Sequence, residues 1–154
     1  SSTSRGLGDV YKRQVLGLLF YFGLLWNLLS TLSLSLACMA IASGDAWSKF
    51  CSAQIINILP YARKEEESKA KVIYDRMSIS TWLPAFIAGG LPMWLFLNRS
   101  YWWAALAPVA VFFLLWQLLR KRLQGYTGDC CGAAFLLCEL SFYLIINLIY
   151  TNLW

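Results

Sequence analysis

Long apolar stretches separated by short polar ones are the dominant pattern of this chain. No charged residue occurs from Gln14 to Gly44, and this stretch is longer than the roughly 20 residues that one helical crossing of a bilayer needs. A polar interval at 30–35, rich in serine, indicates a tight reversal inside the stretch. We therefore predict one helix at about 15–30 and a second at about 33–59, which Pro60 ends because proline interrupts the helical hydrogen-bond ladder.

Three further apolar runs follow the same pattern. The run 79–97 contains Gly89, Gly90 and Pro92, which membrane helices tolerate more readily than soluble ones do. A short loop at 98–100 precedes a run at about 101–119, and the last run extends to Trp154. The pattern predicts an all-α fold: a polytopic integral membrane helical bundle with about five transmembrane helices.

Composition supports the membrane interpretation and excludes several classes of catalytic and metal site. Hydrophobic residues make up 59% of the 154 positions and charged residues 14%, against about 45–50% and about 25% in soluble domains. The chain has no histidine, which excludes Ser-His-Asp triads and histidine-ligated zinc within it. Its five cysteines form no CxxC pair, so we interpret them as reduced, buried side chains.

The first fourteen residues differ from the rest of the chain. Residues 1–14 are polar and contain glycine, and they stop where the apolar sequence begins. They lack the order of regions that defines a signal peptide. We interpret 1–14 as a linker-like or non-native leader, and 15–154 as the transmembrane helical domain.

Basic residues predict the orientation in the membrane. The loop 61–78 carries five lysines and arginines and the loop 120–130 carries three, whereas the loop 98–100 carries one. The positive-inside rule then places loops 61–78 and 120–130 in the cytoplasm and the C-terminus on the opposite side. The 13 basic and 8 acidic side chains give a net charge of +5 and are gathered in a few short stretches, and we expect no nucleic-acid partner.

Two charged residues stand inside the second predicted helix. Asp45 and Lys49 are four residues apart and so lie on one helical face. An isolated charge in a membrane span is costly, so both should face protein or a wet cavity. One interpretation is a mutual ion pair that holds helices together, and the other places Lys49 near a phosphate.

The segment before the last helix contains further candidates. Gly125 and Gly128 permit a tight backbone turn, and Asp129 stands where the next helix should start and its dipole favours an anion. A plain helix cap would explain Asp129 equally well. Glu139 lies ten residues further on, about 15 Å deeper along a helix. It is either functional or a protonated acid bonded to a neighbouring helix.

Arg63 is a candidate phosphate ligand. The loop 61–78 mixes five basic and four acidic residues, as solvated helices commonly do. Arg63 differs from the other charged residues because it follows closely after the helix end at Pro60. A guanidinium at the membrane rim can bind a phosphate through two parallel hydrogen bonds.

Taken together, these segments resemble the C-terminal half of the cobalamin synthase family, the membrane adenosylcobinamide-GDP ribazoletransferases. The family pattern T-G-D-x-x-G-A, followed by two glutamates three residues apart, is matched from Thr127 to Ala133, with Glu139 at the second glutamate. The segments 60–63 and 122–126 contribute to the resemblance. It covers about 15–154.

The resemblance implies a reaction, a cofactor and roles for these residues. Family members join adenosylcobinamide-GDP to α-ribazole or its 5′-phosphate and release GMP, and they depend on Mg²⁺. They belong to the cell inner membrane, and a homo-oligomer is compatible with the family. The implied catalytic residues are Asp129 and Glu139, with Asp129 also the metal candidate. The implied phosphate-binding residues are Lys49, Arg63, Thr127 and Gly128.

The chain departs from the family pattern at three places. Leu136 stands at the first glutamate of the pair, and Lys49 stands where an arginine is common. The acidic stretch of the family's N-terminal half, its expected magnesium site, does not occur here. We therefore expect an incomplete fragment that is inactive alone.

Two other classes of function are compatible with parts of the sequence. One is a small non-enzymatic membrane protein, such as a transporter subunit or assembly factor, in which Asp45, Lys49 and Glu139 would be structural or coupled to ions. The other is a CDP-alcohol phosphotransferase relative, whose spaced aspartates are absent here.

Overall fold

A computed structural model describes residues 2–60, 77–122 and 125–153. Its regular structure consists of α-helices and one 3₁₀ helix, and no strand occurs in these residues, so the all-α prediction is confirmed. In chain order the elements are α1 (Ser2–Ser30), α2 (Leu34–Ile58), α3 (Ile79–Phe96), η2 (Arg99–Ala105), α4 (Leu106–Arg122) and α5 (Gly128–Leu153).

Local sequence accounts for the ends of α2. The Ser33 side chain caps its N-terminus by accepting a hydrogen bond from the Leu36 amide at 3.4 Å. The helix ends at Ile58, directly before the cap residue Leu59 and Pro60. The predicted reversal near residue 31 and the predicted stop at Pro60 are both confirmed.

Two helix starts differ from the prediction. The first helix begins at Ser2 and not near residue 15, because residues 2–14 contain no proline to interrupt the helical ladder. The run after Asn98 opens with the 3₁₀ helix η2, so α4 itself starts at Leu106. The interpretation of residues 1–14 as a linker-like or non-native leader stays a prediction.

Three of the described helical segments are long and apolar enough to cross a bilayer: Ile79–Phe96, Arg99–Arg122 and Gly128–Asn152. The helices α1 and α2 do not meet the same criterion within the described residues. In α2, polar and charged residues such as Asp45 and Lys49 lower the mean hydropathy. The chain is a multi-pass membrane protein.

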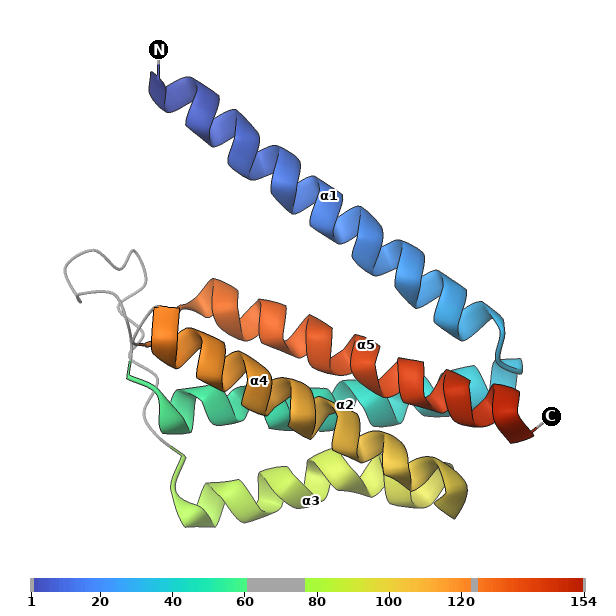
Figure 1. Cartoon of the computed structure of the whole chain (residues 1–154). Coiled ribbons are helices and arrows are strands. Elements are labelled where there is room, and N and C mark those ends of the chain that lie inside the picture. Colours follow the sequence, from blue (N-terminus) through green and yellow to red (C-terminus); the bar gives the residue numbers. More distant parts are fainter. Residues whose placement is uncertain (1, 61–76, 123–124, 154) are drawn as a thin grey trace.

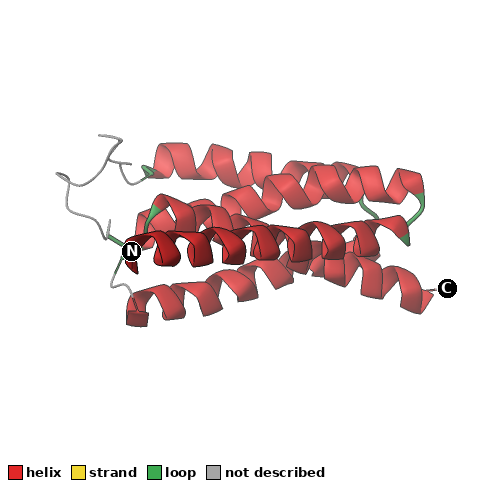
Figure 2. Ribbon diagram, turned by 90° about the horizontal axis from the view of Figure 1, so that it is seen from above, coloured by secondary structure: helices red, strands yellow, loops and turns green. Residues whose placement is uncertain are grey.

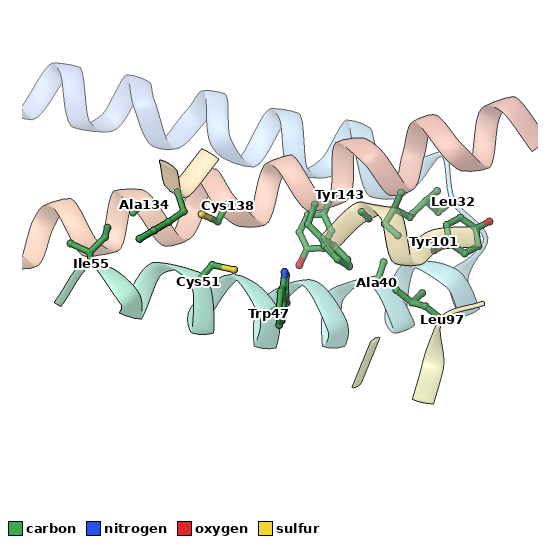
Figure 3. Close-up of a cluster of buried hydrophobic side chains, with 14 of the residues drawn as sticks. Leu32, Ala40, Trp47, Cys51, Ile55, Leu97, Tyr101, Ala134, Cys138 and Tyr143 are labelled. Atoms are coloured by element: carbon green, nitrogen blue, oxygen red, sulfur yellow. The ribbon is translucent and has the colours of Figure 1, made fainter. Parts of the chain in front are cut away.

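The helices α2 and α5 form the centre of the bundle. The helix α2 packs against α3, α4 and α5, whereas α1 packs against α5 and diverges from the other helices toward its N-terminus (Figure 1). The view at right angles shows the helices running roughly along one common direction (Figure 2). Side chains from α2 and α5 meet between the two helices, among them Cys51, Ile55, Ala134 and Cys138 (Figure 3).

Glycines permit two close helix contacts. A Cβ atom on Gly44 would lie 2.6 Å from Cε1 of Tyr143 and 2.8 Å from Cδ1 of Phe142, so α2 approaches α5 there only because Gly44 has no side chain. A Cβ atom on Gly89 would lie 2.9 Å from the Phe50 Cβ, which fixes the approach of α3 to α2. Small residues allow such close packing between membrane helices.

Candidate functional site

The predicted site residues fall into two groups that lie at different depths of the bundle. A rim group, Thr127, Gly128 and Asp129, stands at the start of α5. An interior group, Asp45, Lys49 and Glu139, stands along α2 and α5. Asp129 and Glu139 are ten residues apart on α5, which separates them by about 15 Å along the helix axis. The two predicted catalytic carboxylates are therefore not neighbours.

Backbone pairing positions the rim group. The Tyr126 amide donates a hydrogen bond to the Pro60 carbonyl at 3.0 Å, which joins the segment after α2 to the segment before α5. Thr127 then precedes the helix, and its carbonyl accepts from the Cys131 amide at 3.2 Å. Its hydroxyl contacts the Cys130 sulfur at 3.2 Å. Residue Gly128 is exposed at the first position of α5.

Asp129 is exposed in the first turn of α5, as predicted from the sequence. Its carboxylate makes no hydrogen bond or ion pair within the described residues, so the structure does not support a plain helix cap. The first amides of a helix lack intrahelical partners and carry partial positive charge. An exposed, unpaired carboxylate beside such amides is accessible to a cation or to a substrate hydroxyl.

Arg63, the third predicted phosphate ligand near this rim, lies outside the described residues. The described chain stops at Pro60 and resumes at Met77. Met77 is attached to α2 because its amide donates to the Asn57 side-chain oxygen at 2.8 Å. Pro60 and Met77, the described residues on either side of this gap, thus both lie at the C-terminal end of α2.

Glu139 is the centre of the interior group. It is buried, with 8% of its surface exposed, and each carboxylate oxygen has a tyrosine partner. The Tyr21 hydroxyl donates to Oε2 at 2.7 Å from α1, and the Tyr143 hydroxyl donates to Oε1 at 2.6 Å from the next turn of α5. The expectation that Glu139 bonds to a neighbouring helix is met through Tyr21.

Asp45 and Lys49 form an ion pair within α2, so the pair itself does not hold two helices together as one interpretation of the sequence expected. The Lys49 Nζ lies 2.8 Å from the Asp45 Oδ2, and the two side chains are 63% and 39% exposed, respectively. The same Nζ lies 5.6 Å from the ring centroid of Phe135, one turn before Glu139 on α5. The pair therefore borders the Glu139 cluster.

Sequence reasoning missed the two tyrosines. Tyr143 follows Glu139 by four residues and so had to share its helical face, which the sequence could have shown. Tyr21 lies on a different helix, 118 residues away, and no local spacing relates it to Glu139. Only the packing of α1 on α5 joins them.

The described residues contain no group of three or more histidine, cysteine, aspartate or glutamate side chains that could hold a metal ion. Leu136, which stands at the first glutamate of the family pattern given above, lies about one helical turn before Glu139 on α5. Leu136 lines an apolar groove of about 560 Å³ between α1 and α5, together with Gly17, Tyr21 and Leu140. In the described part of the chain, Asp129 is thus the one exposed, unpaired carboxylate among the predicted residues.

Comparison with known proteins identifies the family. Residues 14–147 match the cobalamin-5-phosphate synthase family. Three similar curated proteins are each named adenosylcobinamide-GDP ribazoletransferase. The Polaromonas protein is 33% identical over 115 residues, covering 68% of this chain and 39% of its own length. The Leptothrix cholodnii protein is 34% identical over 119 residues, covering 70% and 43%. A Shewanella baltica protein is 33% identical over 138 residues, covering 85% and 51%.

The chain spans about half, or less, of the length of these curated relatives. No solved structure matches it. The family match covers most of the chain, including α1 from Gln14 onward and the Thr127–Asp129 segment. The chain belongs to the cobalamin-5-phosphate synthase family.

Proposed function

We propose that the enzyme of which this chain forms part joins adenosylcobinamide-GDP to α-ribazole or its 5′-phosphate, in the biosynthesis of cobalamin. A ribazole hydroxyl attacks the phosphorus that bears cobinamide. A new P–O bond forms, the pyrophosphate bond breaks, GMP leaves with the bonding electron pair, and the hydroxyl proton is released. Family membership carries this proposal, and it favours the enzyme over a small non-enzymatic membrane protein.

The rim group is the proposed position of the reacting phosphates. Phosphoryl transfer depends on positioning and charge neutralisation and needs no covalent nucleophile, so a site without histidine is adequate. The unpaired amides at the start of α5 suit a phosphate oxygen, and Gly128, exposed and without a side chain, allows close approach to the backbone beside half-buried Thr127. Arg63 would add a guanidinium.

Asp129 is the proposed magnesium ligand. Mg²⁺ commonly takes one or two protein carboxylates and completes its coordination with waters and substrate phosphates. The exposed, unpaired Asp129 carboxylate fits one such position, and waters and substrate phosphates would complete the coordination, since the described residues hold no group of three or more histidine, cysteine or acidic side chains there. The ion, when bound, would neutralise negative charge on the transferred group. The protein's contribution here is to keep the Asp129 carboxylate exposed and next to the helix dipole.

The interior group has a separate proposed role. Lys49 would hold a second phosphate, and its 63% exposure supports access. Glu139 is buried and stands about 15 Å from Asp129 along α5, so its proposed role is to position α1 against α5 through Tyr21 and Tyr143, without contact to the reacting groups at the rim.

The proposed location is the cell inner membrane, with loops 61–78 and 120–130 in the cytoplasm. The basic residues Arg120, Lys121 and Arg122 in the last turn of α4 support this orientation. Tests of orientation are direct: a C-terminal alkaline phosphatase fusion should be active outside the cytoplasm, and a fusion after residue 122 should be inactive.

The reaction is tested in an enzyme completed with the N-terminal half of the Shewanella baltica relative. Membranes carrying it should release GMP from adenosylcobinamide-GDP in the presence of α-ribazole and Mg²⁺. Asp129→Asn should lower kcat at least a hundredfold, and Asp129→Glu, which keeps the charge, should retain more activity. If Asp129→Asn left kcat unchanged in an active enzyme, the proposed role of Asp129 would be wrong.

A further inference from the structure

A cavity of about 470 Å³ lies between the C-terminal ends of α2 and α4. It is lined by Ile58, Leu59, Pro60, Trp116 and Arg120. Both helices end on the same side of the bundle (Figure 1). Pro60 lines the cavity and also accepts the hydrogen bond from Tyr126, so the cavity adjoins the segment that leads into Thr127–Asp129. It differs in kind from the grooves along α1, whose linings are almost wholly apolar.

Arg120 brings an unused cation to this cavity. Its guanidinium carbon lies 5.7 Å from the ring centroid of Trp116, one helical turn earlier. Within the described residues the guanidinium contacts this ring, and no carboxylate or carbonyl accepts a hydrogen bond from it. The indole holds the guanidinium in place through a cation–π contact, and the N–H groups stay free to donate.

The charge at this end of the bundle is positive. The C-termini of α2 and α4 each carry about half a negative charge, which attracts cations. Three consecutive cations, Arg120, Lys121 and Arg122, exceed that charge. The Trp116 Nε1–H is buried without a hydrogen-bond partner, so the cavity wall contains a second unused donor, which is covered in this conformation.

We propose that this cavity binds the phosphate group of an anionic ligand through Arg120. The cavity lining combines the planar guanidinium of Arg120, the indole ring of Trp116 and apolar side chains, and it lies at the end of a membrane-spanning segment. Basic pockets between helices at the membrane rim commonly receive lipid phosphates. The phosphate has two sources, the headgroup of an anionic phospholipid and a soluble phosphate compound, and the shared chemistry is a phosphate that accepts from a guanidinium.

The proposal is tested by binding and requires no enzymatic activity, so it fails or succeeds separately from the proposed function. The full chain in neutral detergent with 150 mM salt is titrated with dioctanoyl-phosphatidylglycerol, dioctanoyl-phosphatidylcholine and inorganic pyrophosphate, and binding is followed by calorimetry. For a lipid phosphate, the anionic lipid should bind at least tenfold more tightly than phosphatidylcholine. For a soluble phosphate, pyrophosphate should bind and the two lipids should not differ.

In either case Arg120→Gln should weaken binding at least tenfold. Arg120→Lys should weaken it less, because the charge stays and the fork geometry is lost. Lys121→Gln is the matched control: it removes the same charge one residue away, outside the cavity lining, and should change the affinity less than threefold. Trp116→Phe, which keeps a ring, provides a second variant if Arg120→Gln fails to fold. Equal effects of Arg120→Gln and Lys121→Gln, or no binding of any probe by the wild-type chain, would overturn the proposal.

Discussion

The Tyr21 hydroxyl on α1 lies 2.7 Å from the Glu139 carboxylate on α5, although 118 residues separate them in the chain. This hydrogen bond crosses from the one helix that diverges from the bundle to a buried group at its centre (Figure 1). It stands beside a second bond to Glu139, from Tyr143. The packing of α1 on α5 and the hydrogen bonding of the Glu139 carboxylate are therefore linked.

Tyr21→Phe should weaken the attachment of α1 to α5. Hydrogen bonds between membrane helices contribute about 0.6 kcal/mol on average and up to about 1.7 kcal/mol. Buried Glu139 should place this bond near the upper value. A double-mutant cycle with Glu139→Gln, measured by reversible unfolding in mixed micelles, gives the coupling energy. Tyr11→Phe is the control, because Tyr11 is 64% exposed on the same helix. A coupling energy indistinguishable from zero would contradict the structure.

Gly44→Ala should destabilise the contact between α2 and α5. The new Cβ would lie 2.6 Å from the Tyr143 ring, so the helices must separate or the ring must turn. Overpacking of this kind costs about 1–3 kcal/mol. The change should also disturb the bond from Tyr143 to Glu139. Thermal unfolding in detergent measures the effect, and Gly23→Ala, where nothing lies within 4 Å of the added atom, should have almost none. Equal unfolding temperatures for the two variants would refute this prediction.

Single replacements in the Asp45–Lys49 pair should impair membrane insertion more than the double replacement does. Asp45→Asn leaves the Lys49 ammonium without its 2.8 Å partner, and Lys49→Gln leaves the carboxylate alone. On insertion scales, an unpaired charge at the centre of a membrane helix costs about 2.5–3.5 kcal/mol, which is the upper bound for α2 because its polar residues already lower its hydropathy. The variant with both changes carries no charge there and should insert at least as well as wild type. A glycosylation-site insertion assay compares the three variants. Additive losses would show that the two side chains do not form a pair.

Asn147→Ala should loosen the end of α1. The Asn147 side-chain amide donates to the Leu28 carbonyl at 2.9 Å and to the Thr31 hydroxyl, so it holds the α1–α2 turn on α5. Spin labels at Leu16 and Leu144, both exposed, should report a broader distance distribution in the variant. Asn152→Ala is the matched control, because in the described part of the chain the Asn152 amide donates to the Leu148 carbonyl of its own helix and to no other helix. The prediction fails if both variants give the same distribution.

The sequence by itself determined the features that depend on near neighbours in the chain. Apolar runs predicted the helices, Pro60 determined where α2 stops, and the four-residue spacing of Asp45 and Lys49 predicted their ion pair. These follow from the helical repeat and from the backbone chemistry of proline. The motif from Thr127 to Ala133 also indicated the family that the comparisons identify.

The tertiary structure alone decided how the candidate residues are grouped. It put Asp129 at the exposed rim and Glu139 in a buried cluster, and it supplied Tyr21 from a distant helix. It also brought the end of α2 to Arg120 and to the segment before α5. Such contacts depend on the rotation and spacing of packed helices, which a residue like Gly44 sets by its missing side chain. No local pattern along the chain contains that information.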